Sequence, residues 1–454
     1  MKNIIDLNKY LGHTISCPCG KIHKTDLKII DICENAASHL PIHMYSLGFQ
    51  HAFLVADVNT YAAAGIYAEE ALQKEGLLAG TYIFPDAELI PDEFSVGRLV
   101  QALPKSADVI LVAGSGTLND LCKFVSYQCG LEYMVFASAP SMDGFVSVGA
   151  ALITDHVKTT YDAHVPIAVI ADTEILASAP MEMITAGLGD ILGKYTCLLD
   201  WKIAHLIEGE YYCEDISDMV KNSVYICTEQ GPKIKSRDPE AVKAVMEALL
   251  LTGIAMSFTG NSRPASGSEH HLSHYWEMQF QMQGKKPILH GIKVGVGMLT
   301  SIYMYQKLLQ EAPVFSEIKD YGFDYPVWEE KVKSCYLDAA NGILELEKAC
   351  RKNDIPNRNK RLAIIEEKWD SIKDLISAEI PSLKMMKNLL ASLDAPINPA
   401  QIGISSVMVE DAILLAKEVR NRYTILQLLW DLGLLSKYAK DTASYFAEED
   451  QKIL

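Results

Sequence analysis

The stretch that decides the fold is VILVAGSGTLNDLCKF, residues 109–124. Residues 109–113 are apolar, as in a strand that is covered on both faces. Gly114 and Gly116 then interrupt the run, and a helical pattern begins near Asn119. Such a turn lets the backbone approach a phosphate, and the helix N-terminus adds unbonded N–H groups. Because the turn is neither a GxGxxG fingerprint nor a P-loop, both nucleotide binding and a plain structural turn remain open.

Outward from this stretch, short apolar runs alternate with helical patterns such as residues 61–76 and 119–129. This alternation predicts a parallel, doubly wound α/β sheet. The strands are predicted at residues 51–57, 80–86, 109–114, 132–138 and 166–172.

Beyond residue 172 the sequence reads as long helices, and Pro180 suits the first turn of the first one. We therefore predict an α/β nucleotide-binding domain over residues 1–176 and an α-helical domain over residues 177–454. The clearest helical patterns cover residues 181–208, 239–258, 268–283, 291–309 and 329–351.

The charge and the apolar pattern exclude several classes of partner. The 41 Lys and Arg against 58 Asp and Glu give a net charge of −17, which repels nucleic acid and anionic lipid. The N-terminal MKNIIDLNKY lacks the apolar core of a signal peptide, and the longest uncharged apolar stretch, residues 248–258, is too short to cross a bilayer. A cytoplasmic protein without membrane insertion is expected.

The ten cysteines are scattered, and some, such as Cys122 and Cys197, lie in apolar runs typical of reduced, buried thiols. The string CPCGKIH brings Cys17, Cys19 and His23 together and could be half of a zinc site. Since no second pair stands at a matching spacing, we favour a structural turn.

Asp57 follows the predicted strand 51–57, at the end where α/β folds bind nucleotides. A carboxylate there can accept both hydroxyls of an adenosine ribose and would repel a 2′-phosphate. It is equally typical of a helix N-cap, so both interpretations stay open.

Potential metal ligands lie in the helical half: Asp190, His270 with His274 one turn later, and His290 before a glycine-rich helix start. One carboxylate and two imidazoles with an open position are what a catalytic divalent metal needs. Alternatively, Asp190 pairs with Lys194, the histidines form a polar helix face and His290 is a cap. His271 points about 100° away from His270 and is the poorer ligand.

At these residues the chain resembles the superfamily of iron-type alcohol dehydrogenases, glycerol dehydrogenases and dehydroquinate synthases, and within it the bacterial glycerol-1-phosphate dehydrogenases. GSGTLNDLCK, residues 114–123, is similar to the family turn GGGSxxDxxK, with Ser115 for a glycine and Thr117 for the serine. SAPSMDGFVS, residues 138–147, is similar to the segment that meets substrate. HGIKVG departs from the pattern, because many relatives carry glutamate instead of Ile292.

The resemblance implies a Rossmann-like N-terminal domain, an all-α C-terminal domain and an active site in the cleft between them. It implies metal ligation by Asp190, His270 and His290 and substrate contacts at Asp143, Asp190 and His274. The implied nucleotide contacts are Asp57, Gly114, Ser115, Gly116, Thr117, Leu118, Ser138, Ala139, Pro140, Ser141 and Ser147.

The implied activity is the NAD(P)H-dependent reduction of dihydroxyacetone phosphate to sn-glycerol 1-phosphate. The resemblance also implies that the enzyme is a homodimer and that it serves phospholipid metabolism. One divalent ion per chain, nickel or zinc with iron also permitted, would polarise the ketone. His274 would help to supply the proton, and Asp143 would hold the terminal hydroxyl.

For the substrate phosphate we expect donors in GNSRPASGS, residues 260–268, above all Arg263 with Ser262 and Ser266, and a further candidate in Lys158. A surface capping loop and a solvated lysine are the competing interpretation. Three other functions stay open: a glycerol or polyol dehydrogenase, a dehydroquinate-synthase-like lyase, and a non-catalytic metal or nucleotide sensor.

Overall fold

The computed structural model describes residues 5–86, 88–154, 157–318 and 322–453. Contacts divide the chain into two compact units, which we call the sheet unit (Met1–Ile191 with Asp218–Ser262) and the helical unit (Leu192–Ser217 with Arg263–Leu454). The two units are interleaved in sequence, unlike the domains 1–176 and 177–454 that the sequence predicts. Helix α10 (Pro239–Thr259), for example, packs on α6 (Thr173–Ser178) and belongs to the sheet unit. The limits of the predicted domains stay a prediction.

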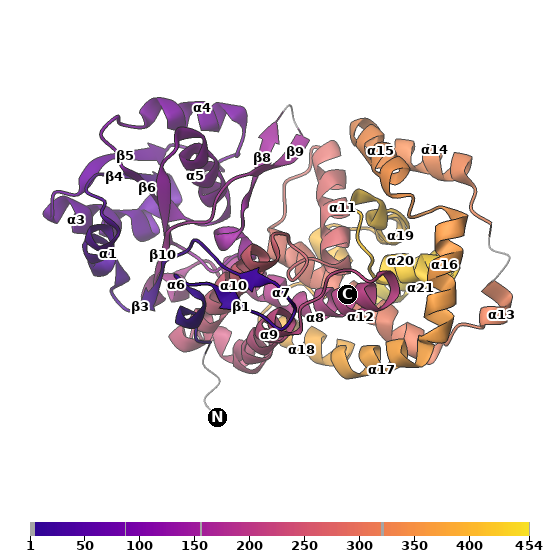
Figure 1. The fold of residues 1–454 in the computed structure, drawn as a ribbon. Helices are drawn as coiled ribbons and strands as arrows, with labels where there is room; N and C mark the ends of the chain where they lie inside the picture. The colour runs from indigo at the N-terminus through magenta and orange to yellow at the C-terminus, as the bar shows by residue number, and fades with distance from the viewer. Residues whose placement is uncertain (1–4, 87, 155–156, 319–321, 454) are drawn as a thin grey trace. The chain divides into compact units, whose positions relative to one another are not determined.

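A six-stranded parallel sheet forms the centre of the sheet unit, as predicted (Figure 1). The strands lie in the order β3-β10-β7-β6-β4-β5. Their bounds are β3 Ile29–Cys33, β4 Ala52–Asp57, β5 Leu78–Phe84, β6 Val109–Gly114, β7 Glu132–Ala137 and β10 Ala168–Asp172.

Five of these strands match the predicted runs, and the edge strand β3 was missed. Its sequence, IIDIC, carries Asp31 in the middle, which interrupts the apolar run that marks the other strands. Among the described strands only β10 pairs with it, and four of its five residues are half-buried. Two antiparallel pairs lie outside the sheet: β1 (Ile15–Ser16) with β2 (Ile22–His23), and β8 (Gly149–Thr154) with β9 (Val157–Asp162).

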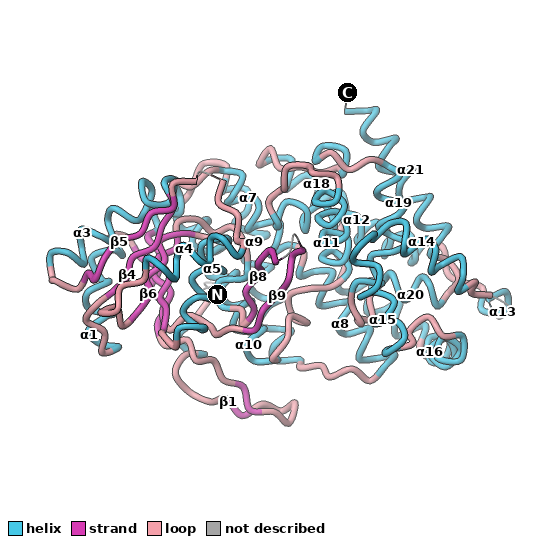
Figure 2. Tube along the Cα trace, turned by 90° about the horizontal axis from the view of Figure 1, so that it is seen from above, coloured by secondary structure: helices cyan, strands magenta, loops and turns pink. Residues whose placement is uncertain are grey.

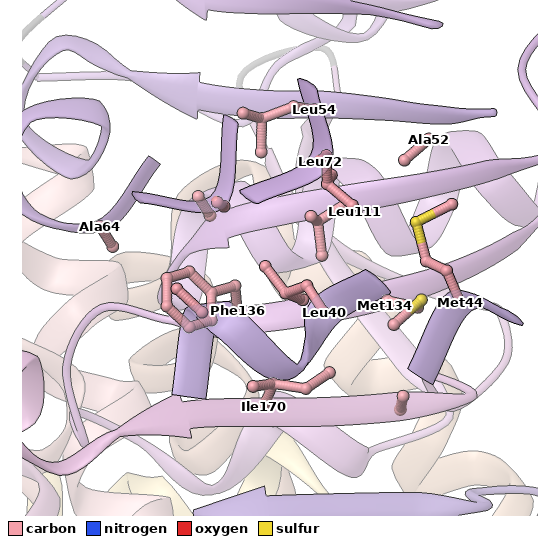
Figure 3. Packing of buried hydrophobic residues seen from close by; sticks show 14 of the residues in the cluster. Leu40, Met44, Ala52, Leu54, Ala64, Leu72, Leu111, Met134, Phe136 and Ile170 are labelled. Atoms are coloured by element: carbon pink, nitrogen blue, oxygen red, sulfur yellow. The ribbon is translucent and has the colours of Figure 1, made fainter. Parts of the chain in front are cut away.

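Helices cover both faces of the sheet, which explains why its strands are apolar throughout. On one face, side chains such as Leu54, Leu111 and Phe136 pack against Leu40 of helix α1 (Leu40–Leu47) (Figure 3). The other face contacts α5 (Gly116–Cys129). Figure 2 shows the strands gathered among these helices.

The chain reverses its direction of travel across the sheet at β4. From β4 it passes to β5 on one side and then to β6 on the other side. The chain therefore leaves β4 and β6 toward opposite sides of the sheet, and the carboxyl ends of strands at such a switch point are where α/β sheets bind ligands.

Helix α10 spans 21 residues and is long and apolar enough to cross a membrane by length and composition alone. In the structure 83% of the most apolar 18-residue stretch of this helix is buried, which is typical of a core helix. The other helical segments of the first 262 residues are η1 Asn8–Tyr10, η2 Ala36–His39, α2 Val58–Thr60, η3 Tyr61–Gly65, α3 Ile66–Lys74, α4 Glu93–Ala102, η4 Asp143–Val146, α7 Met181–Leu192, α8 Lys194–Glu208 and α9 Glu214–Ile234.

The C-terminal part is helical, as predicted, but two predicted helices are each divided in two. Residues 181–208 form α7 and α8, which are separated at Gly193, and residues 329–351 break at Leu337, whose φ is +47°. The elements are α11 Ser268–Met282, α12 His290–Gln310, α13 Phe315–Ile318, α14 Tyr325–Tyr336, η5 Leu337–Ala339, α15 Ala340–Cys350, α16 Ile355–Glu367, α17 Trp369–Glu379, α18 Leu383–Ser392, η6 Pro399–Ile402, α19 Ser406–Leu415, η7 Ala416–Val419, α20 Ile425–Asp431 and α21 Leu435–Ile453.

Candidate functional site

The glycine turn after β6 ends in a helix N-terminus that no side chain caps. Helix α5 begins at Gly116, earlier than predicted, and Ser115 precedes it in an extended conformation without a side-chain cap bond. The first amides of α5 are therefore suited to receive an anion. At Gly114 a Cβ would lie 2.7 Å from Leu118 Cδ1, so any larger residue there would have to displace the Leu118 side chain.

Asp57 caps the helix that follows β4. Its Oδ1 accepts the backbone N–H groups of Asn59 and Thr60, each at 2.8 Å. The Asp57 N–H in turn donates to Thr60 Oγ1 at 3.0 Å, which completes a capping box. The helix-cap interpretation of Asp57 is therefore correct. Both cap bonds use Oδ1, so the cap itself leaves Oδ2 to a ligand at the carboxyl end of β4.

Lys123 holds the loop that follows β7, and its role was missed at the sequence level. Its Nζ donates to the carbonyl oxygens of Gly144 (2.8 Å) and Gly149 (3.1 Å) and to Ser147 Oγ (3.0 Å). The side chain is fully buried, and burial lowers the pKa of this ammonium despite Asp120 3.5 Å away. In the sequence, a lysine on the apolar face of a helical pattern was the one feature that could have indicated this buried role.

Two glycines let helices close on the loop of residues 138–147, which contains the predicted contacts Ser138, Ala139, Pro140 and Ser141. A Cβ at Gly187 of α7 would lie 1.8 Å from Pro140 O, and one at Gly253 of α10 would lie 2.7 Å from Val146 Cβ. The loop is also bonded to α7, because the Asp143 N–H donates to Asp190 Oδ2 at 3.0 Å. The backbone of Asp143 and the carboxylate of Asp190, both predicted site residues, are therefore in contact within the sheet unit.

In the helical unit, the three predicted histidines converge. The ring centroids of His270 and His290 are 5.1 Å apart, and that of His274 lies 6.0 Å and 5.7 Å from them. His270 and His290 also present ring nitrogens within 4.8 Å of each other. Helices α11 and α12 approach so closely because Gly297 has no side chain: a Cβ there would lie 2.5 Å from Glu269 O.

Glu269, which no sequence motif marked as a functional residue, orients His270. Its Oε1 lies 2.8 Å from His270 Nδ1 and also accepts the Gly267 N–H, while Oε2 accepts from Thr196 Oγ1 at 2.6 Å. Burial lowers the pKa of His270 well below its usual value, so this ring is neutral. An Nδ1–H bonded to Glu269 leaves the lone pair of Nε2 for a ligand, as in carboxylate–histidine–metal arrangements.

His274 is a neutral imidazole beside a carboxylate. Burial lowers its pKa to about 3, although Glu277 Oε2, 3.6 Å from Nδ1, opposes the shift. Lys293 in turn lies 3.4 Å from Glu277. His271 is buried apart from this cluster, and neither of its ring nitrogens has a hydrogen-bond partner in the described chain, as expected for the histidine that points away.

Arg263, the predicted phosphate donor, is buried and engaged by protein groups. Its Nε and Nη2 donate to Glu210 at 2.9 and 3.0 Å, and Nη2 also donates to Tyr423 O at 2.7 Å. These bonds give Arg263 a structural role, so a substrate phosphate would have to compete with a carboxylate. Ser266 is likewise buried, and the side chain of Lys158 lies outside the described part of the chain.

The ten cysteines, all in the described residues, form no disulfide, which agrees with the predicted reduced thiols.

Comparisons with known proteins agree with these motifs. The family model of iron-containing alcohol dehydrogenases matches residues 31–180. The chain is 32% identical to a glycerol-1-phosphate dehydrogenase [NAD(P)+] of Halalkalibacterium halodurans, over 91% of this chain and 95% of that protein. A protein of the same name from Geobacillus thermodenitrificans is 33% identical, over 94% of this chain and all of its own length.

Solved structures share the fold. A probable glycerol dehydrogenase from Sinorhizobium meliloti superposes with a TM-score of 0.57 at 16% identity, covering 91% of this chain and 98% of its own. Maleylacetate reductase from Agrobacterium tumefaciens gives 0.60 at 15% identity, with 92% and 98% covered. The relatives that match over nearly their full length show that the chain belongs to the glycerol-1-phosphate dehydrogenase family of iron-containing alcohol dehydrogenases.

Proposed function

We propose that this protein uses NAD(P)H to reduce dihydroxyacetone phosphate reversibly to sn-glycerol 1-phosphate. The observation that carries the proposal is its identity of about one third with glycerol-1-phosphate dehydrogenases along nearly the whole chain. The uncapped N-terminus of α5 at a strand switch point supports nucleotide binding. The three converging imidazoles support the chemistry.

Asp190, His270 and His290 are the metal ligands in this proposal. The donor set fits a divalent metal, because His270 and His290 present neighbouring ring nitrogens and Glu269 fixes the ring of His270. One carboxylate and two imidazoles accept nickel, zinc or iron. When bound, the metal would act as a Lewis acid on the ketone and the nicotinamide would be the hydride source.

The chain's own residues have distinct tasks. His274, neutral at pH 7, can pass a proton between solvent and the substrate oxygen without placing a second positive charge beside the metal site. Asp143, whose backbone is tied to Asp190, would accept the terminal hydroxyl of the substrate and so select the face that is attacked. The resemblance also assigns Asp57, the glycine turn and the loop of residues 138–147 to the nucleotide.

Arg420 is a better candidate than Arg263 for the substrate phosphate. Its positive charge contributes to the lowered pKa values of His270 and His274, so it acts on the same cluster. Burial alone lowers the pKa of Arg420 itself, with no carboxylate of the described residues opposing it. Arg263, by contrast, already has Glu210. A desolvated guanidinium without a carboxylate is suited to bind a phosphate.

The decisive experiment is NADH oxidation by the purified protein with dihydroxyacetone phosphate, and with dihydroxyacetone as the matched ketone without phosphate. We expect a preference for the phosphorylated ketone of roughly a thousandfold, since about 4 kcal/mol is a modest sum for charge-assisted bonds. Arg420→Gln should remove most of that preference while it leaves the phosphate-free ketone almost unchanged. Equal rates with both ketones would make the protein a polyol dehydrogenase, and no oxidation with either would refute a reductase.

The metal is tested separately. Asp190→Ala should lower the content of bound divalent metal as well as activity, because two imidazoles alone bind weakly. An unchanged metal content in this variant would refute the ligand set. We also propose a cytoplasmic homodimer that supplies phospholipid synthesis; light scattering that gives the mass of a single chain would contradict the dimer.

A further inference from the structure

We propose that Cys17, Cys19 and His23 bind a structural zinc ion, at a site separate from the catalytic metal. Each of the three offers one ligand atom, and these atoms lie within 4.8 Å of one another. The closest pair is Cys19 Sγ and His23 Nε2, 3.4 Å apart. Two sulfur ligands and one imidazole select zinc over the harder divalent ions.

The backbone fold of this segment presents the two thiols from one tight turn. The Gly20 N–H donates to Cys17 O at 3.0 Å, and the Cys17 N–H donates to Lys21 O at 3.1 Å. Pro18 follows Cys17, where proline favours a turn, and Gly20 has a φ of +85°, which favours glycine. Strand pairing between Ile15 and His23 then places the His23 imidazole beside the turn.

The environment of His23 prepares its Nε2 for a metal. Its Nδ1 lies 3.2 Å from the carbonyl oxygen of Phe258, which can only accept, so Nδ1 carries the proton. The lone pair then resides on Nε2, the atom that faces Cys19. The ring is 3% exposed and stacks on Phe258 at 5.4 Å. A backbone carbonyl that fixes the tautomer is the usual outer partner of a metal-bound histidine.

The site also explains how this segment is held. Strands β1 and β2 have two residues each, and a pair that short is not stable alone. A zinc ion shared by both arms of the hairpin would cross-link it and, through His23, anchor it at the end of α10. The cysteines are one residue closer together than in common zinc turns, so the fourth position falls to water or to a side chain outside this loop.

Cobalt substitution separates this site from the catalytic one, because only this site has sulfur ligands. Protein loaded with Co²⁺ should show thiolate-to-cobalt charge-transfer absorption. Cys19→Ser should weaken that absorption and lose about one equivalent of zinc per chain. Asp190→Ala, which removes a proposed ligand of the other metal, should leave the absorption unchanged, and Cys129→Ser, which removes an exposed thiol of the same unit, should leave both readouts unchanged.

The wild-type protein keeps the test decisive even if Cys19→Ser fails to fold. We expect titration of the cobalt-loaded protein with a thiol-specific mercurial to release cobalt in step with the loss of the charge-transfer absorption. Absence of that absorption in cobalt-loaded wild-type protein overturns the proposal, and so does a Cys17–Cys19 disulfide found by mass spectrometry in protein purified without reductant. Neither result bears on the activity with dihydroxyacetone phosphate, so the two proposals fail separately.

Discussion

The central strands of the sheet unit bury apolar residues, and ionisable groups appear where these strands end. In β4 and β10, for example, the buried runs finish at Asp57 and Asp172. The helical unit instead buries ion pairs in its interior: Arg361 with Asp431, and Lys417 with Glu418. Parallel strands satisfy their backbone within the sheet, whereas many short helices leave termini and loop carbonyls that buried side chains must satisfy.

This difference has a consequence for how the active-site residues are held. In the sheet unit the proposed nucleotide site is mainly backbone, shaped by Gly114 and by the buried Lys123. In the helical unit it is made of side chains that other buried polar groups orient, as Glu269 orients His270. Damage to a buried charge should therefore affect the helical unit more than the sheet unit.

The largest expected effect comes from Arg361→Met. Arg361 Nε and Nη2 donate to the two oxygens of Asp431 at 2.8 and 2.7 Å, and Asp431 is fully buried. Removing the guanidinium leaves a buried carboxylate with hydrogen bonds from Tyr423 and Gln427 but without its cationic partner, so the free energy of unfolding should fall by about 3–5 kcal/mol in urea denaturation. The double variant Arg361→Met/Asp431→Leu should recover much of that loss.

The matched control is the Arg98–Asp86 pair of the sheet unit, which has the same chemistry at 2.8 Å but lies at the surface. Arg98→Met should change the urea midpoint little. If Arg98→Met and Arg361→Met lowered the midpoint equally, the contrast between the two units would be wrong.

The sequence predicted the parts of the molecule that depend on local pattern. The strands β4 and β6, the glycine turn and the pair His270 and His274 follow from apolar runs and helical spacing, which need no knowledge of distant residues. Strand β3 was not predicted because Asp31 interrupts its apolar run.

The polar networks could not be predicted in this way, because their partners are far apart in sequence. Arg263 stands in an exposed-looking loop of polar residues and glycines, yet its partners are Glu210 and Tyr423, 53 and 160 residues away. The role of Glu269 depends on Thr196, which comes from another helix. Sequence patterns report which face is buried but not which distant group satisfies a buried charge.

Two glutamates, Glu418 and Glu247, should respond to pH with opposite signs. Burial would raise the pKa of Glu418, but Lys417 (2.6 Å), Lys352 and Asn353 outweigh it and lower the pKa to about 2. The ionised form therefore stabilises the fold above about pH 4.5, and this contribution is lost as the pH falls toward 2. Glu418→Gln should cost roughly 3 kcal/mol at neutral pH, and its difference from wild type should shrink in acid. A difference that stays constant from neutral pH to about pH 3 would contradict this.

Glu247 of α10, in the sheet unit, should behave in the opposite way. Burial raises its pKa to about 7, and Lys243 only partly opposes the shift. Since the folded state prefers the protonated form, stability from this group is present below about pH 4.5 and is lost as the pH rises through 7. Glu247→Gln should therefore raise the urea midpoint above pH 7 and leave it almost unchanged near pH 4. A fall in the midpoint above pH 7 would mean that Lys243 stabilises the Glu247 carboxylate by more than burial destabilises it.

Gly187→Ala tests the close packing of the loop that carries Asp143. The new methyl group would meet Pro140 O, a backbone atom that cannot turn aside, so we expect a loss of roughly 1–3 kcal/mol of stability and a higher KM for NADH. Gly97→Ala in α4 is the control, because nothing lies within 4 Å of that position. It should stabilise by about 0.5–1 kcal/mol. An unchanged KM in Gly187→Ala would separate the loop from nucleotide binding.

The smallest effect should come from Asp57, where two roles share one carboxylate. Asp57→Ala removes both the cap on Asn59 and Thr60 and any contact with the ribose, so it should cost about 1 kcal/mol and raise the KM for NADH. Asp57→Ser separates the roles, because a serine hydroxyl caps a helix well but carries no charge to repel a 2′-phosphate. We expect Asp57→Ser to keep the stability of wild type while its KM values for NADH and NADPH draw together. If the ratio of the two KM values in Asp57→Ser stays that of wild type, the carboxylate acts only as a helix cap on Asn59 and Thr60 and does not select the nucleotide.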